Sequence, residues 1–374
     1  MTDIEGFSAP GFEAVAEAFG RNFTEYGEVG AAFAAYRDGE LVVDLWGGTA
    51  SPSEPWQRDT LQLIFSGTKG LAAGCVLWLV ERGRLDLDAP VARYWPEFGA
   101  AGKHGITVAD VLTHQSRLPG IVRPFSVPEM LDARFMAVVL AAQPPTADPR
   151  AAFIYHALTF GWLVDELVRR VDGRGVAQLF AEEFAAPLGL EVWIGLPDKL
   201  HHRATVMTAA PGALIGLPPP DDELLATVLR NPLVLDGAPE IWNSPEYRRA
   251  GMVAVGAFGT ARSLARYYAC LARGGELDGV RVLEEATVDA GCRERRRGKS
   301  ALWGSEFAYA TGFELTPDVF GPAPDAFGHA GFGGSRHAAW PAARVGFSYV
   351  MSQVRSAYPD PRPLGLLAAL HLAL

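Results

Sequence analysis

The sequence lacks the features that define several large classes of protein. Its three cysteines are an odd, widely spaced set without a CxxC pair, so neither a disulfide framework nor a thiolate zinc site is indicated. Its longest apolar runs, residues 71–80 and the C-terminal LGLLAALHLAL, are shorter than the roughly 18 residues that a membrane-spanning helix needs. The N-terminal stretch MTDIEGFSAPGF is acidic and has no apolar centre. We therefore expect no secretory signal, and a cytoplasmic protein.

Positive charge is also scarce. The 374 residues carry 33 basic and 43 acidic side chains, a formal net charge of −10, which disfavours nucleic-acid and anionic-membrane partners. Hydrophobic residues make up 49% and charged residues 20%, as in a compact globule of one large domain or two interleaved ones. Only four of the basic residues are lysines, so the position of each lysine is informative. No metal or organic cofactor is implied, and the oligomeric state stays open.

Both ends of the chain predict strands of one sheet. Residues 11–26 have helical periodicity, and two β-prone runs flank Asp38-Gly39, a strong hairpin signal. Residues 335–354 form a second pair of β-prone runs around a Pro-Ala-Ala turn, and an apolar helix follows from about Pro363. We expect an antiparallel sheet, assembled from both termini and flanked by terminal helices.

The middle of the chain favours helices, separated by Pro- and Gly-rich loops. Helical composition or periodicity recurs in five segments: 70–83, 108–113, 128–142, 159–171 and 175–184. We therefore predict an α/β plus all-α architecture, with a sheet domain from residues 1–84 and 246–374. A mostly helical domain, residues 85–245, is inserted between its halves, and we expect the active site in the groove between the two.

The sharpest chemical signal is Ser66-Gly67-Thr68-Lys69. A short extended segment precedes this S-x-x-K, and an apolar helix follows it, so Ser66 and Lys69 share one face of the first helical turn. A serine hydroxyl is a weak nucleophile unless a nearby base takes its proton. A lysine can do so once burial and the positive end of a helix dipole favour its neutral form. Taken alone, the tetrapeptide fits a surface lysine behind a capping serine better than a catalytic pair.

Two later segments favour the catalytic interpretation. Tyr155-His156-Ala157 precedes a helix, and His329-Ala330-Gly331 leads into a strand. S-x-x-K, a tyrosine about 90 residues later and an [H/K]-x-G before a strand are together typical of one superfamily. The chain resembles the serine β-lactamases and penicillin-binding proteins, specifically the class C-like branch with the family VIII carboxylesterases and related acyltransferases. Residues 112–116 (LTHQS) and 259–266 (GTARSLAR) also resemble elements of that branch.

This resemblance implies a β-lactamase/transpeptidase-like fold and a role for each motif residue. Ser66 resembles the acylated nucleophile, Lys69 its proton acceptor, and Tyr155 the tyrosine that shuttles a proton. The oxyanion hole would use the backbone N–H groups of Ser66 and Phe332. His329, Gly331 and Phe332 would contact the substrate. A phenol suits proton shuttling if a cation lowers its pKa, and we expect Lys69 to be that cation.

Departures from the superfamily pattern bear on the substrate. Ala157 replaces the asparagine of Y-x-N, and His329 replaces a lysine, which removes a fixed positive charge at neutral pH. Arg117 stands where a glycine is usual, and the E-x-x-L-N segment of class A enzymes is missing. These differences favour hydrolysis of a small-molecule carboxylic ester through an acyl-Ser66 intermediate. Two alternatives stay open: acyl transfer to an amine or alcohol in a biosynthetic pathway, and a non-catalytic binding protein on the same fold.

Other residues carry weaker signals. We expect His114 to order a loop by hydrogen bonding, His201-His202 to lie in a solvated turn rather than a metal site, and residues 293–297 (RERRR) to form a solvated loop. Three aromatic residues could line a cleft, although aromatic residues are more often part of a core: Trp242, Trp303 and Phe307.

Overall fold

The central element of the fold is an antiparallel sheet built from both ends of the chain. The computed structural model describes residues 3–213, 221–230, 238–302, 304–355 and 360–374. Within them the main sheet has the strand order β1-β3-β2-β15-β14-β13, with β4 paired to β3. Its strands are β1 (Ile4–Ser8), β2 (Gly30–Arg37), β3 (Glu40–Ser51), β4 (Glu54–Pro55), β13 (Phe327–Ala330), β14 (Arg336–Trp340) and β15 (Val345–Met351).

The predicted hairpin and the joining of the two termini are both confirmed. Asp38 and Gly39 connect β2 to β3 with φ values of 52° and 90°, the left-handed pair that a tight two-residue hairpin turn requires. Strand β2 then pairs along its other edge with β15, from Ala31 opposite Met351 to Arg37 opposite Val345. Residues more than 300 positions apart in the sequence thus form the middle of the sheet.

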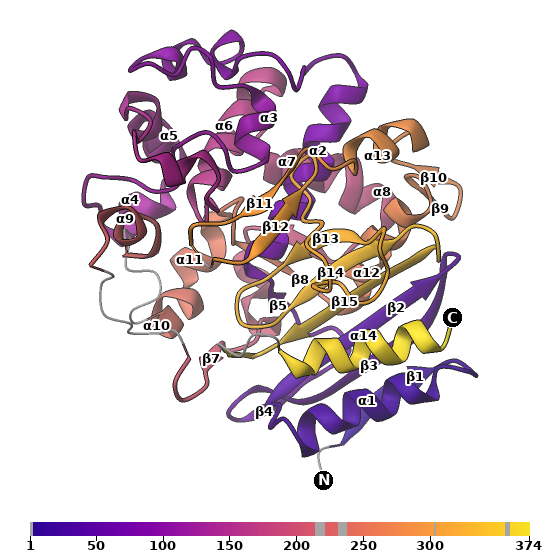
Figure 1. Cartoon of the computed structure of the whole chain (residues 1–374). Helices are drawn as coiled ribbons and strands as arrows, with labels where there is room; N and C mark the ends of the chain where they lie inside the picture. The colour runs from indigo at the N-terminus through magenta and orange to yellow at the C-terminus, as the bar shows by residue number, and fades with distance from the viewer. Residues whose placement is uncertain (1–2, 214–220, 231–237, 303, 356–359) are drawn as a thin grey trace.

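Helices cover both faces of this sheet (Figure 1). On one face lie α1 (Glu13–Thr24) and α14 (Pro361–Leu372), which pack against each other. They bury a core that includes Phe19, Phe33, Trp340, Phe347 and Leu366. On the other face, α12 (Ala261–Ala272) packs on β2, β14 and β15. Its neighbour α2 (Thr68–Glu81) is buried at nearly every residue. This burial is expected of a helix whose own side chains are mostly apolar on every face.

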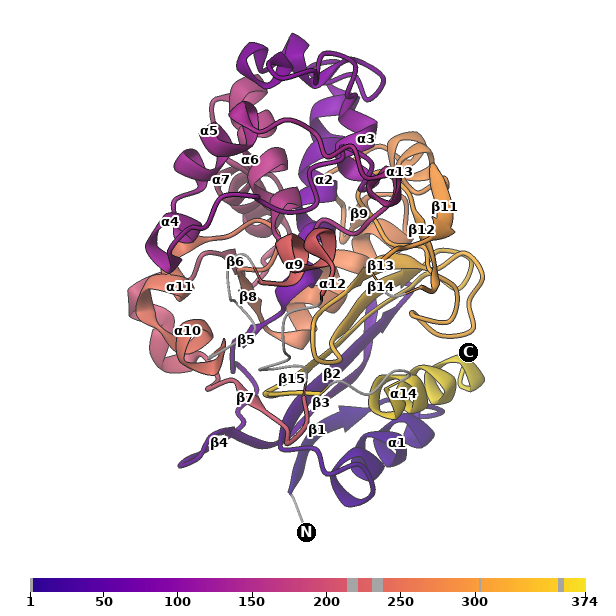
Figure 2. The ribbon, with the colours of Figure 1, turned by 60° about the vertical axis from the view of Figure 1, so that its left-hand side comes forward.

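The helices that follow α2 and precede β8 (Ala257–Gly259) lie on the side of the molecule away from α1 and α14 (Figure 2). They are α3 (Val108–Leu112), α4 (Val127–Leu131), α5 (Ala133–Ala142), α6 (Thr159–Asp172), α7 (Val176–Phe180), α8 (Ala186–Leu188), α9 (Glu223–Arg230), α10 (Ala238–Asn243) and α11 (Pro245–Ala250). Short 3₁₀ turns lie among them: η2 (Val91–Arg93), η3 (Pro96–Gly99), η4 (Pro149–Ala152) and η6 (Asp198–Arg203). A short π-helix, η5 (Ala181–Ala185), joins α7 to α8. Helices α3 to α7 correspond to the predicted periodic segments, whereas the sequence analysis predicted no individual helix at the positions of α8 to α11.

Three details differ from the sequence predictions. The helix expected over 128–142 is two helices, because Asp132 leaves helical geometry and caps α5 by accepting the N–H of Phe135. The stretch expected to be mostly helical also holds short strands, β6 (Val192–Ile194) and β7 (Thr208–Ala209). The basic run is not a loop throughout: β11 (Arg296–Lys299) pairs with β12 (Glu306–Tyr309), and Arg297 is ion-paired to Glu294 and Glu306.

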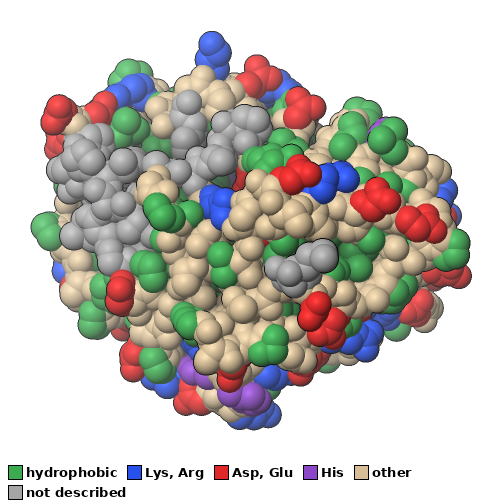
Figure 3. All heavy atoms as spheres, turned by 90° about the horizontal axis from the view of Figure 1, so that it is seen from below, with side chains coloured by type: hydrophobic (Ala, Val, Ile, Leu, Met, Phe, Trp, Pro, Cys, Tyr) green, Lys and Arg blue, Asp and Glu red, His purple; other side chains and the backbone are tan. Residues whose placement is uncertain are grey.

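The remaining elements are small. They are β5 (Gln62–Leu63), η1 (Phe65–Gly67), β8 (Ala257–Gly259), β9 (Glu276–Leu277), β10 (Val280–Arg281), α13 (Glu285–Gly291) and β16 (Gln353–Val354). Acidic and basic side chains are interspersed on the face seen in Figure 3. Among the described residues, no helix combines the length and apolar character needed to cross a bilayer.

Candidate active site

Ser66 lies in a turn that is fixed from both sides. Strand β5 pairs with β8, and the chain then passes through η1, whose first residue, Phe65, has a φ of +45°. The Thr68 hydroxyl donates to the Phe65 carbonyl at 2.7 Å and accepts the N–H of Ala257 at 3.0 Å. A non-glycine residue in left-handed geometry costs free energy and persists only where such contacts hold it. The turn therefore presents Ser66 in one orientation at the start of α2.

Lys69 faces Ser66, as the S-x-x-K spacing predicts. Its Nζ lies 3.1 Å from Ser66 Oγ and also donates to the carbonyls of Ala157 at 3.0 Å and Ala254 at 3.1 Å. The Lys69 side chain has no exposed surface. Burial holds the pKa of Lys69 well below its usual value of 10.5, and the negative charge of Glu314 opposes this shift only in part. Burial thus favours the neutral amine, which lies within hydrogen-bond distance of a hydroxyl.

Tyr155 joins this pair from the segment between η4 and α6. Lys69 Nζ lies 4.8 Å from the centre of the Tyr155 ring. Burial raises the pKa of the Tyr155 phenol above its usual value of 10, although a hydrogen bond with Ser66 opposes the shift. The expectation that Lys69 lowers the pKa of Tyr155 is therefore wrong. Burial disfavours the charged form of Lys69 as well, and the groups that shift the pKa of Tyr155 are Ser66 and Glu314 rather than Lys69.

Two histidines support the segment that carries Tyr155. The backbone N–H of His156 donates to His114 Nδ1 at 3.1 Å, and the His114 ring lies 4.6 Å from the Tyr155 ring. His156 Nδ1 donates to the Ile154 carbonyl at 2.7 Å, so its Nε2 accepts the Ser116 hydroxyl at 2.8 Å. Burial lowers the pKa of both histidines, that of His156 to about 4, and both are neutral. His114 thus orders this loop, as its motif predicts.

The edge strand β13 brings the third motif to the site. His329 is buried, and its Nδ1 donates to the Ala330 carbonyl at 2.9 Å. Burial lowers the pKa of His329 to about 3, so it carries no charge at neutral pH. Phe332 lies in the turn that follows β13 rather than on the strand itself. Among the described residues, none accepts the backbone N–H of Phe332. This leaves that N–H available to a substrate oxygen.

Close packing explains why the third motif has a glycine, Gly331. A Cβ on Gly331 would lie 2.4 Å from the carbonyl oxygen of Ile64 and 2.1 Å from Ser335 Oγ. Ile64 is two residues before Ser66, so glycine at this position allows the turn after β13 to approach the nucleophile segment closely.

The arginine in place of a glycine after L-T-H-x-S is also accommodated. Arg117 has a φ of +58°, the left-handed geometry for which glycine is the usual residue. Its guanidinium donates to the carbonyls of Asp148 at 3.2 Å and Thr146 at 3.4 Å. The side chain therefore braces the loop before Tyr155.

Three aromatic rings pack together at the residue before the nucleophile. Phe65, Trp242 and Phe332 meet one another edge to face, with ring centres 4.9 to 6.0 Å apart. Trp242 is buried and belongs to the main core, as expected of most aromatic residues. Phe307 is half-buried and stacks on Tyr309, while Trp303 lies outside the described residues.

Sequence reasoning missed one charged group at the site, Glu314. Its Oε2 accepts the N–H of Ala330 at 3.3 Å and lies 3.9 Å from His329 Nδ1. Burial raises the pKa of this carboxyl group, and its charge raises the pKa values of Lys69 and Tyr155. Glu314 is a single acidic residue in an apolar stretch, a position that carries no motif signal.

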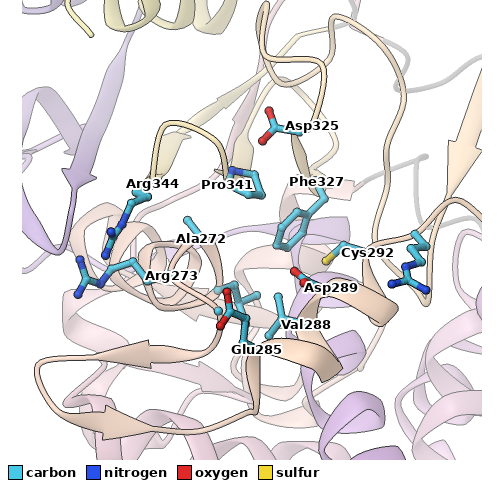
Figure 4. Close-up of a pocket in the computed structure, with 13 residues that line it drawn as sticks. Ala272, Arg273, Glu285, Val288, Asp289, Cys292, Asp325, Phe327, Pro341 and Arg344 are labelled. Atoms are coloured by element: carbon cyan, nitrogen blue, oxygen red, sulfur yellow. The ribbon is translucent and has the colours of Figure 1, made fainter.

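Two cavities lie outside the cluster of Ser66, Lys69, Tyr155 and His329. One of about 720 Å³ opens between the end of α12, α13 and the start of β13 (Figure 4). Its lining includes Arg273, Glu285, Asp289 and Arg344, and its thiol, Cys292, has a pKa raised by burial. It holds no serine or histidine, and hence no activated nucleophile. Among the described residues, no three His, Cys, Asp or Glu side chains are placed to bind a metal ion, His201 and His202 included.

Known proteins resemble this chain along almost its full length. The family model described as Beta-lactamase matches residues 13–370. Esterase/beta-lactamase LipL of Mycobacterium tuberculosis is 34% identical over 389 residues, which cover 99% of this chain and 87% of LipL. A crystal structure described as a family VIII carboxylesterase is 37% identical, covers 100% of both chains and superposes with a TM-score of 0.92. EstA from Arthrobacter nitroguajacolicus Rue61a is 32% identical over 98% of this chain and 97% of EstA, with a TM-score of 0.88.

Fold, motif order and full-length similarity agree. The chain belongs to the β-lactamase family, in the class C-like branch that contains the family VIII carboxylesterases.

Proposed function

We propose that this protein is a serine carboxylesterase that hydrolyses small esters through an acyl-Ser66 intermediate. One observation carries the proposal: Lys69 Nζ, fully buried and with a lowered pKa, lies 3.1 Å from Ser66 Oγ. A neutral amine at this distance can accept the serine proton as the oxygen attacks an ester carbonyl.

Acylation follows from the positions of four groups. Ser66 Oγ attacks the carbonyl carbon, and Lys69 takes its proton. The backbone N–H groups of Ser66 and Phe332 stabilise the negative charge that develops on the carbonyl oxygen. The neutral phenol of Tyr155 donates its proton to the leaving alkoxide, and the Lys69 ammonium then returns a proton to Tyr155. The alcohol departs, and Lys69 is neutral again.

Deacylation uses the same groups in reverse. Water attacks the acyl carbon, and its proton passes through Tyr155 to Lys69 as the second tetrahedral intermediate forms. The Lys69 ammonium then protonates Ser66 Oγ as the C–O bond of the acyl-enzyme breaks. The carboxylic acid leaves, and the free enzyme is restored. Because the raised pKa keeps Tyr155 protonated between steps, the phenol acts as a proton relay and Lys69 as the base.

The surroundings of Ser66 favour an uncharged substrate. His329 is neutral, so the site offers no fixed cation there for a substrate carboxylate. Ala157 provides no side-chain amide group, and the half-buried Phe332 provides an apolar ring. The names of the similar proteins, an esterase and a carboxylesterase, point to the same chemical class.

A chromogenic ester and an active-site label test the proposal. The wild-type protein should release p-nitrophenol from p-nitrophenyl butyrate and gain one adduct mass with a fluorophosphonate, and Ser66→Ala should do neither. The matched control is Ser263→Ala, because Ser263 lies in α12 and its hydroxyl accepts the N–H of Glu191. If neither protein reacts, the protein is no serine esterase. If the ester is consumed only with an added amine or alcohol, the enzyme is an acyltransferase instead.

We also propose a cytoplasmic location and a two-part organisation. All three cysteines are free thiols, as is usual in a reducing compartment.

The proposed sheet domain, residues 1–84 and 246–374, contributes four site residues: Ser66, Lys69, His329 and Phe332. Tyr155 comes from residues 85–245, so the site would lie in the groove between the two domains.

A further inference from the structure

The turn that carries the Phe332 N–H has little rigidity of its own. It runs from Gly331 to Ser335 and contains three glycines, of which Gly333 and Gly334 have φ values of +85° and +131°. Within the turn, Gly331 donates to the Ser335 carbonyl at 3.0 Å and Gly334 to the Gly331 carbonyl at 3.4 Å. Glycines lose more conformational freedom on ordering than other residues. An oxyanion donor in such a turn therefore needs support from outside.

A buried arginine supplies a contact of that kind. Arg362, the second residue of α14, is 0% exposed, and its Nη2 donates to the Gly333 carbonyl at 2.9 Å. That carbonyl is one residue beyond Phe332. The backbone N–H of Arg355 donates to the same oxygen at 3.3 Å. The contact thus joins the C-terminal helix to the turn beside the proposed oxyanion hole.

Two carboxylates and a phenol hold this guanidinium in place. Arg362 Nη1 donates to both oxygens of Glu28 at 3.1 and 3.2 Å, and Nε and Nη2 donate to Asp360 at 2.8 to 3.3 Å. The Tyr349 hydroxyl donates to Glu28. All four side chains are buried. The planar fork of an arginine, with five N–H donors, can serve Glu28, Asp360 and Gly333 together, whereas a lysine ammonium cannot.

The turn fits closely against this network. A Cβ on Gly334 would lie 2.6 Å from Asp360 Oδ2 and 2.7 Å from Arg362 Nη2. The absence of a side chain at this position is therefore required for the turn to approach the ion pair. A buried ion pair is by itself weak evidence for stability, because desolvation of the charges opposes their attraction. Its contact with the turn gives it a further role.

We propose that Arg362 is a positioning residue for ester hydrolysis. By holding the Gly333 carbonyl, it keeps the Phe332 N–H directed at the developing oxyanion. The proposal rests on the proposed esterase function. An oxyanion donor interacts most strongly in the transition state, so its displacement lowers kcat and changes KM little.

Three variants isolate the contact with Gly333. Arg362→Lys keeps a positive charge for the two carboxylates but cannot also reach Gly333 in the same geometry. Glu28→Gln removes one charge of the network and keeps Arg362 with its contact to Gly333. The double variant Glu28→Gln/Arg362→Met removes that contact and leaves one uncompensated buried carboxylate instead of two. Arg248→Met is the matched control, because Arg248 is another buried arginine that donates to backbone carbonyls, those of His201 and Thr205.

The readouts are kcat and KM for p-nitrophenyl butyrate, with thermal melts to measure the folded fraction. We expect kcat to fall about 10-fold in Arg362→Lys and about 10- to 100-fold in the double variant, part of the 10²- to 10³-fold effect of losing an oxyanion donor. KM should stay within about 3-fold of wild type, and Glu28→Gln and Arg248→Met should keep kcat within about 3-fold. Affinity for a boronic acid transition-state analogue should fall in parallel with kcat.

The outcomes separate this proposal from the proposed function. If folded Arg362→Lys and the double variant keep wild-type kcat, Arg362 does not position the turn. The same conclusion follows if Glu28→Gln lowers kcat as much as the double variant does. If the wild-type protein shows neither turnover nor a Ser66 adduct, the esterase function itself is wrong.

Discussion

The protein buries two of its four lysines completely, and the two differ in what they contact. Lys69, in α2, and Lys103, in the loop between η3 and α3, are both 0% exposed, and both donate to backbone carbonyls. Burial lowers the pKa of each. Lys103 donates to the carbonyls of Ala141 and Gln143 and lies over the Phe98 ring, whereas Lys69 also contacts the Ser66 hydroxyl. A desolvated lysine is therefore not a catalytic signal by itself. The neighbouring nucleophile makes the difference.

The largest expected effect comes from removing that nucleophile. Ser66→Ala leaves Lys69 with carbonyl partners alone, as Lys103 has, and no acyl-enzyme can form. We expect kcat to fall by about 10⁴-fold or more, since loss of a nucleophile costs up to about 10⁶-fold in comparable enzymes. Ester turnover and intact mass after labelling measure this. Turnover above one hundredth of the wild-type rate would show that Ser66 is not the nucleophile.

Lys69→Met should be the next most severe change. A general base contributes about 10²- to 10⁴-fold, and the other hydrogen-bond partner of Ser66, the Tyr155 phenol, is a poor substitute because its raised pKa keeps it protonated. The variant should still fold, because methionine fills a similar volume without a buried amine. Ester turnover and a thermal melt test both expectations. A variant that keeps a tenth of the wild-type kcat would remove Lys69 from the mechanism.

The pH dependence of wild-type activity reports on the same group. Lys69 must be neutral to accept a proton, so activity should fall as pH decreases through its lowered folded-state pKa. Between that pKa and the unfolded value of 10.5, the unfolded state binds the extra proton, so wild-type stability should rise with pH. The slope from this group is at most about 1.4 kcal/mol per pH unit. Melts at several pH values should show a smaller slope for Lys69→Met. An unchanged slope would mean that Lys69 is charged in the folded protein.

Tyr155→Phe should lower kcat by about 10²-fold, within the range of general acid–base catalysis, because the ring stays and only the proton relay is lost. Since burial raises the pKa of this phenol, the wild-type enzyme should show no alkaline activity change from Tyr155 below pH 10. The measurements are kcat and a pH–rate profile from pH 6 to 10. Near wild-type turnover would reduce Tyr155 to a packing role.

The double variant Ser66→Ala/Tyr155→Phe should have hardly lower turnover than Ser66→Ala alone, since the two residues act as a unit.

The fold was largely predictable from local signals. Asp38-Gly39 specifies a hairpin within a few residues, and S-x-x-K places Ser66 and Lys69 on one face of a single helical turn. The resemblance also predicted that Ser66, Tyr155 and His329 meet at one site, but contacts and burial that no motif marks were not predictable. Glu314 reaches the site through the pairing of its backbone with Gly328, and the pKa of Tyr155 depends on burial by distant segments. A local sequence pattern indicates neither the burial of a side chain nor such long-range pairing.

A smaller effect is expected from His329→Ala. His329, on β13, lies beside the Tyr155 ring. Its pKa of about 3 keeps it neutral, so it contributes shape and hydrogen bonding rather than charge. We expect KM to rise and turnover to stay measurable, with kcat/KM down by about 10-fold, as for loss of one uncharged contact of about 1.4 kcal/mol. The pH–rate profile between pH 5 and 8 should keep its shape. A change of shape in that range would show that His329 titrates in the working enzyme.

The smallest effect on activity should come from Lys103→Met, which directly tests the comparison of the two lysines. No hydroxyl of the described residues is a hydrogen-bond partner of Lys103, so ester turnover should stay within about 2-fold of wild type. Its ammonium nevertheless satisfies the carbonyls of Ala141 and Gln143, and the Gln143 side chain holds Gly120 and Val122. Leaving buried carbonyls unpaired should cost about 1–3 kcal/mol of unfolding free energy, measured by urea titration. If Lys103→Met instead lowers kcat as strongly as Lys69→Met while the protein stays folded, a buried lysine in either region affects catalysis. The hydroxyl partner would then not be what distinguishes Lys69.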